Sequence, residues 1–133
     1  MKKWALYYLI MALAILLGAW SAHGLANWLS PAKVDSFKTG VQYQFFQVIG
    51  LMILAANEGR HEALKSTLSK IQNLILIGMM LFSGSIYLLS LNEIWKWNVI
   101  KWLGPVTPIG GALMILGWLW VAVAYFKTSK NEN

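Results

Sequence analysis

Residues 71–92 read IQNLILIGMMLFSGSIYLLSLN, which is 22 consecutive residues without Lys, Arg, Asp or Glu. A helix needs about 20 mostly apolar residues to cross the hydrocarbon core of a membrane, which is roughly 30 Å thick. The run Leu74-Ile75-Leu76-Ile77 does not alternate between apolar and polar residues, as the strands of a membrane barrel do. Because lipid cannot hydrogen-bond the backbone, residues 71–92 predict a transmembrane helix.

Three further stretches lack these charged residues. They are residues 4–32, 39–57 and 102–126, with lengths of 29, 19 and 25 residues. Each stretch is about long enough for one crossing of the membrane. We therefore predict an all-α fold, an integral membrane four-helix bundle formed by one domain over residues 1–133. The helices are expected at about residues 4–28, 39–57, 71–91 and 105–126.

The composition excludes several classes of protein. Hydrophobic residues make up 58% of the chain and charged residues 12%, whereas soluble chains have about 25% charged residues. This excludes a disordered chain and disfavours a water-soluble enzyme. The chain has no cysteine, and in residues 61–65 (HEALK) Lys65 replaces the second His of the HExxH zinc motif. We expect no enzymatic activity, no catalytic residues, no cofactor and no metal site.

The distribution of positive charges predicts how the chain is oriented in the membrane. Four crossings place the N-terminus, residues 58–70 and the C-terminus on one side, which carries seven Lys and Arg residues against four on the other. Such residues concentrate on the cytoplasmic side, so we expect a multi-pass protein with both termini in the cytoplasm. The net charge of +6 is explained by contacts with anionic lipid headgroups. No basic stripe interleaves with aromatic residues, so no nucleic-acid partner is expected.

Polar side chains inside the predicted helices are the candidates for function. With a rise of about 1.5 Å per residue, they fall at a similar depth in the outer half of the membrane, and the inner half is expected to hold no comparable layer. An ionisable group such as His23 is a functional candidate there, although polar groups also join helices in a purely structural way. The candidate polar layer comprises His23, Tyr43, Gln44, Gln47, Ser83, Ser85, Tyr87 and Thr107.

Four short elements of the chain resemble one known family. The family patterns are G-A-x-G-A-H, T-G-V-x-Y-Q, F-S-G-S-x-Y and T-P-x-G-G, and the corresponding residues here are 18–23, 39–44, 82–87 and 107–111. In this order they resemble the small membrane-protein family named transmembrane protein 256, or domain of unknown function 423. The resemblance implies a four-helix, multi-pass protein of the bacterial cytoplasmic (inner) membrane, without an established activity. Two departures are Ser21 in place of the second Gly, and Gln47 where the family often has His.

Two classes of function remain. The favoured one is a structural or accessory protein that binds membrane lipids or a larger membrane complex, or that associates with itself. Small residues such as Ala14, Gly18 and Gly110 support it, because they let helices pack closely. The alternative is a small transporter or channel with a polar half-site in the outer half of the membrane. Broken helices and paired halves are expected of a transporter, and only Thr107-Pro108 suggests such a break.

Overall fold

The computed structural model describes residues 1–98 and 100–131, and every regular element over these residues is a helix. Four of these helices are long and apolar enough to cross a membrane, which confirms the predicted all-α fold and its four candidate spans. The long helices are α1 (Lys2–His23), α2 (Pro31–Glu58), α3 (Lys65–Trp95) and α5 (Val106–Asn131), and the short ones are η1 (Leu25–Asn27), η2 (Glu62–Leu64) and α4 (Ile100–Leu103).

The first two helices begin and end at other residues than predicted. α1 ends at His23 instead of near residue 28, and Gly24 leads into the 3₁₀ turn η1. α2 starts at Pro31 instead of near residue 39. Proline suits the first turn of a helix, where its missing N–H is not needed, so Ser30-Pro31 begins α2 instead of only stopping the helix before it.

Charged residues end the uncharged stretches of the chain but do not end the helices. α2 has 28 residues and is therefore about 42 Å long, which exceeds a hydrocarbon core of roughly 30 Å. The predicted range 71–91 is likewise shorter than α3, which has 31 residues. The predicted range 105–126 starts one residue before α5 and ends five residues before its last residue, Asn131. The helices continue into surroundings where charged side chains are solvated.

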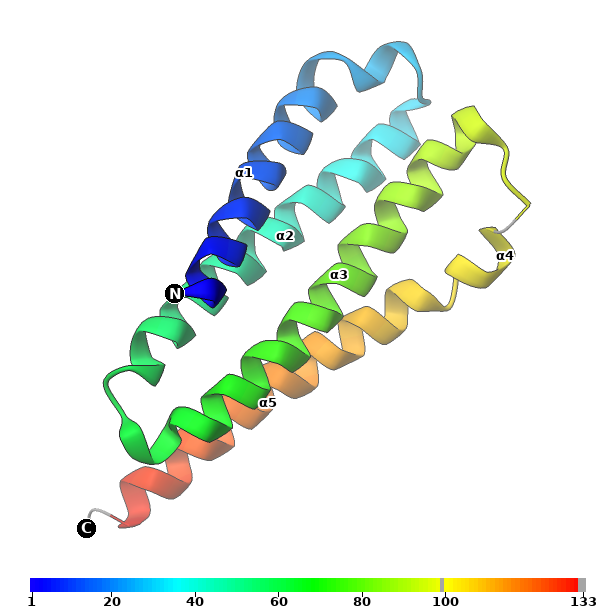
Figure 1. The fold of residues 1–133 in the computed structure, drawn as a ribbon. Helices are drawn as coiled ribbons and strands as arrows, with labels where there is room; N and C mark the ends of the chain where they lie inside the picture. The colour runs from blue at the N-terminus through cyan, green and yellow to red at the C-terminus, as the bar shows by residue number, and fades with distance from the viewer. Residues whose placement is uncertain (99, 132–133) are drawn as a thin grey trace.

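α2 and α3 form the centre of the bundle. α2 packs along both α1 and α3, and α3 also packs along α5. α1 and α5 do not pack against each other to a comparable extent. In Figure 1 the four long helices accordingly follow one another across the molecule in chain order. The central pair therefore has two flanks, one completed by α1 and the other by α5.

Glycine lets α3 and α5 meet backbone to backbone. A Cβ atom added at Gly78 of α3 would lie 2.9 Å from the carbonyl oxygen of Gly110 on α5, and one added at Gly110 would lie 2.7 Å from the carbonyl oxygen of Gly78. Side chains larger than hydrogen therefore do not fit at this crossing. On α1 the small residues Ala14 and Gly18 face other parts of the bundle, since Ala14 is buried and Gly18 faces Val41 of α2. Ala22, four residues further on, is exposed.

Both chain ends lie at the same end of the bundle, which we call the termini end. The Lys3 ammonium is 3.3 Å from a carboxylate oxygen of Glu58, the last residue of α2. The rings of His61 and Tyr125 are 6.1 Å apart, which brings α5 beside the connection between α2 and α3. At the opposite end, the Ser30 N–H donates to Glu93 over 3.1 Å and joins the start of α2 to the end of α3.

Candidate functional site

Gln44 joins three helices on the α1 flank of the central pair. Its amide nitrogen donates to the carbonyl oxygen of Ile10 on α1 over 2.9 Å, and its side-chain oxygen accepts from the hydroxyl of Tyr87 on α3 over 2.6 Å. Ser83 donates to the carbonyl oxygen of Gly40 over 2.8 Å in the same region. These polar groups satisfy one another across the helices, which is the arrangement expected of a structural contact.

Ser85 and Thr107 form a second, separate contact. Their hydroxyl oxygens are 2.7 Å apart and join α3 to the first turn of α5. Ser85 also donates to the carbonyl oxygen of Phe82 over 3.0 Å, so Thr107 can serve as the donor to Ser85. This bond lies close to the glycine crossing and holds the same two helices together.

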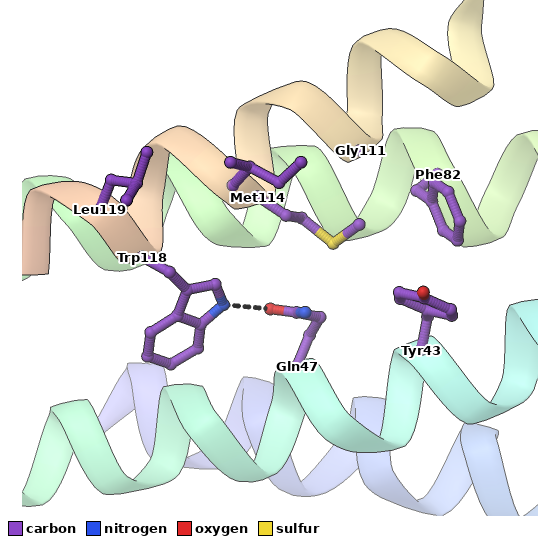
Figure 2. Close-up of a pocket in the computed structure, with 8 residues that line it drawn as sticks. Tyr43, Gln47, Phe82, Gly111, Met114, Trp118 and Leu119 are labelled. Atoms are coloured by element: carbon purple, nitrogen blue, oxygen red, sulfur yellow. Dashed lines mark hydrogen bonds between the residues drawn. The ribbon is translucent and has the colours of Figure 1, made fainter.

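Tyr43 and Gln47 line a groove on the α5 flank, with a volume of about 510 Å³. Figure 2 shows Trp118 of α5 donating its indole N–H to the side-chain oxygen of Gln47, over 2.8 Å. The rings of Tyr43 and Phe82 are 4.8 Å apart and stand at the other end of the view. The groove is lined by Tyr43, Gln47, Phe82, Gly111, Met114, Ile115, Trp118 and Leu119.

His23 does not join the other seven residues of the predicted layer. It is the last residue of α1 and its side chain is exposed. Over the described residues no hydrogen bond links it to the polar groups of α2, α3 or α5. The structure thus distributes the predicted set over three contacts and one exposed residue, instead of one continuous layer.

The termini end holds a polar cluster that contradicts the predicted absence of a comparable layer there. Tyr7 donates its hydroxyl to the side-chain oxygen of Gln72 over 2.9 Å, and the Gln72 amide donates to Glu58 over 2.6 Å. Lys3 pairs with Glu58 and also donates to the hydroxyl of Ser69 over 2.6 Å. Gln72 is 0% and Tyr7 1% exposed, so the cluster leads from a surface ion pair into the core.

A periodic pattern in α3 could have revealed this cluster. Leu68, Gln72, Ile75 and Met79 are spaced by four, three and four residues, which places Gln72 on the buried stripe of the helix. Glu58 gives no such signal, because a charged residue beside a glycine is typical of a loop. The partners of Gln72 depend on how α1 and α2 pack against α3, which the sequence does not specify.

The arrangement offers hydrogen bonds between helices and one apolar groove. In the part of the chain that the structure describes, no group of three or more His, Cys, Asp or Glu residues could hold a metal ion. The ion pair between Lys3 and Glu58 lies at the surface of the termini end, away from the groove. The groove is lined by residues of α2, α3 and α5.

Comparison with known proteins identifies relatives over most of the chain. A family model described as "Protein of unknown function (DUF423)" matches residues 17–111. The UPF0382 membrane protein YwdK of Bacillus subtilis is 35% identical over 115 residues, which are 86% of this chain and 88% of that protein. A UPF0382 membrane protein of Haemophilus influenzae is 36% identical, with 86% and 85% covered. The UPF0382 inner membrane protein YgdD of Escherichia coli is 28% identical, with 88% and 83% covered. No solved structure shows a significant match.

Proposed function

Since the chain belongs to the DUF423 family of proteins of unknown function, we propose that it is a structural or accessory protein without enzymatic activity, which binds a lipid or a larger complex in the bacterial inner membrane. Its relatives are named membrane proteins, and one is named an inner membrane protein. The observation that carries the proposal is the groove between α2, α3 and α5, which opens sideways among the candidate membrane spans.

The surroundings of the groove favour an apolar occupant. Its volume of about 510 Å³ lies within the range of about 300–1,000 Å³ that is usual for ligand sites. Ile115 and Leu119 on its rim are largely exposed, and a surface of this kind faces hydrocarbon in a membrane. A lipid chain or an apolar side chain of a partner would fill the groove without a desolvation cost.

A transporter or channel is less well supported. Transport sites usually lie where membrane helices are broken, but α2 and α3 are continuous from Pro31 to Glu58 and from Lys65 to Trp95. The polar atoms of Gln44, Ser83 and Tyr87 bond to other parts of the protein. They therefore offer few groups to a passing polar substrate.

The accessory role predicts that a ligand or partner stays bound to the protein and copurifies with it in a mild detergent. Mass spectrometry of the purified full chain is expected to show an enriched lipid or a stoichiometric membrane protein. Gly111→Leu serves as the groove variant, because a Cβ atom at Gly111 has only ordinary contacts, at 3.6 Å or more from the Phe82 ring, and the rest of the leucine would fill the groove. We expect this variant to lose the enriched species. A wild-type chain that carries neither lipid nor partner contradicts the proposal.

The charge distribution supports a cytoplasmic location for the termini end, as seven of the 11 Lys and Arg residues lie there. The chain has no cysteine, so single cysteines can report the orientation. We expect Asn27→Cys, which is exposed at the opposite end, to react with a membrane-impermeant maleimide in spheroplasts. Ser129→Cys, which is exposed at the termini end, should react only after the membrane is opened. The reverse pattern of labelling contradicts this orientation.

A further inference from the structure

Two polar side chains of the groove lie close to the middle of α2. Tyr43 is 12 residues from Pro31 and Gln47 is 11 residues from Glu58, which places them about 18 Å and about 16 Å from the two ends of the helix. If the uncharged stretch 39–57 crosses the membrane, Gln47 is near the midplane of the bilayer, and Tyr43 is about 6 Å from the end of this stretch at Thr39. The groove thus combines apolar walls with polar groups at a depth where water is absent.

Tyr43 and Gln47 each have a hydrogen-bond donor that no acceptor of the described residues binds. The oxygen of Gln47 accepts from Trp118, and Figure 2 shows its amide nitrogen directed away from the indole, toward the side of Tyr43. Over the described residues no acceptor binds this amide nitrogen or the hydroxyl of Tyr43. An unsatisfied donor in hydrocarbon costs several kcal/mol, so these two groups favour a ligand that brings an acceptor.

The depth of the donors selects the kind of lipid. The ester carbonyls of a glycerophospholipid lie at the edge of the hydrocarbon core, about 15 Å from the midplane, and do not reach Gln47. A lipid-soluble quinone is neutral, has two carbonyl acceptors on a flat ring and dissolves in the core itself. Aromatic side chains pack well on such a ring, and Tyr43, Phe82 and Trp118 line the groove.

We infer that the groove binds the ring of an isoprenoid quinone, whose carbonyl oxygens accept hydrogen bonds from the Gln47 amide and the Tyr43 hydroxyl. The tail leaves the groove along its exposed apolar rim, past Ile115 and Leu119. This inference rests on the proposed lipid-binding function and specifies the lipid. It concerns binding alone and involves no transfer of electrons to the protein.

The test measures binding to the purified full chain in detergent micelles by isothermal titration. The probes are a benzoquinone with a short alkyl tail and the alkylbenzene with the same tail, which lacks the carbonyl acceptors. We expect saturable binding of one quinone per chain and no saturable binding of the alkylbenzene. Tyr43→Phe, which removes only the hydroxyl, is expected to raise Kd about fivefold, and Gln47→Leu about tenfold.

Gln42→Leu is the matched control, because Gln42 is exposed on the same helix and does not line the groove. Its Kd should equal that of the wild type. Equal binding of both probes, or an unchanged Kd in Tyr43→Phe, overturns the quinone assignment. If the quinone does not bind but Gly111→Leu still loses an enriched lipid, the quinone inference fails and the proposed function stands. If no lipid or partner depends on the groove, both fail.

Discussion

Gly110→Ala is expected to destabilise the bundle by about 3 kcal/mol, whereas Gly111→Ala should change its stability by less than about 1 kcal/mol. A Cβ atom at Gly110 would meet the backbone nitrogen of Phe82 and would lie 2.7 Å from the carbonyl oxygen of Gly78. Neither backbone group can rotate away, so α5 would have to move from α3. At Gly111 the nearest atom is a ring carbon of Phe82 at 3.6 Å, which is an ordinary contact.

The free energy of unfolding of the two variants can be compared by titration with SDS in mixed micelles, followed by circular dichroism. The neighbouring positions share the same helix and the same chemical change, so each controls for the other. Equal stability of the two variants would show that α3 and α5 are not in backbone contact at Gly110. A loss of stability in Gly111→Ala but not in Gly110→Ala would contradict the register of α5 against α3.

Gln72→Leu is expected to cost about 2 kcal/mol of stability, because the leucine satisfies neither of the two partners of Gln72. The Tyr7 hydroxyl would lose its acceptor, and the Glu58 carboxylate would lose a donor at 2.6 Å. Bonds to a charged group are stronger than those between neutral groups, so the contact with Glu58 should contribute the larger share. Asn73→Leu is the control, since Asn73 is the exposed neighbour on the same helix.

A double-mutant cycle separates the two bonds of Gln72. Tyr7→Phe removes only the hydroxyl, and its effect should largely disappear when Gln72 is already leucine. Unfolding of the two single variants and the double variant gives the coupling between the side chains. If Gln72→Leu and Asn73→Leu are equally stable, the buried cluster at the termini end does not contribute to stability.

The number of the long helices could be predicted because each membrane crossing must be apolar, about 20 residues long and internally hydrogen-bonded. Stretches such as residues 71–92 are apolar and long enough, and only a helix satisfies their backbone. The helix ends could not be predicted in the same way. Lys33, Asp35 and Lys38 precede the predicted range 39–57, yet they lie in the first turns of α2, because charged residues are compatible with a helix outside the hydrocarbon.

The polar contacts were harder to predict than the residues that make them. Gln44 and Gln47 both belong to the predicted polar layer, and their spacing of three residues places them only about 60° apart around α2. α2 faces three other helices, however, so this small rotation directs Gln44 to Ile10 and Tyr87 and Gln47 to Trp118. Which partner each residue meets depends on the packing of whole helices, and glycines such as Gly110 set that packing.

The separation of α1 and α5 by the central pair has a consequence for the biogenesis of the protein. A chain emerges from the ribosome with its N-terminus first, so α1, α2 and α3 can enter the bilayer and complete the contacts of Gln44 before α5 is inserted. The groove needs Trp118 and Met114 of α5 as its second wall. The groove therefore forms only at the final insertion step among these helices, and an intermediate with three inserted helices would be packed on the α1 flank while its groove still lacked this wall.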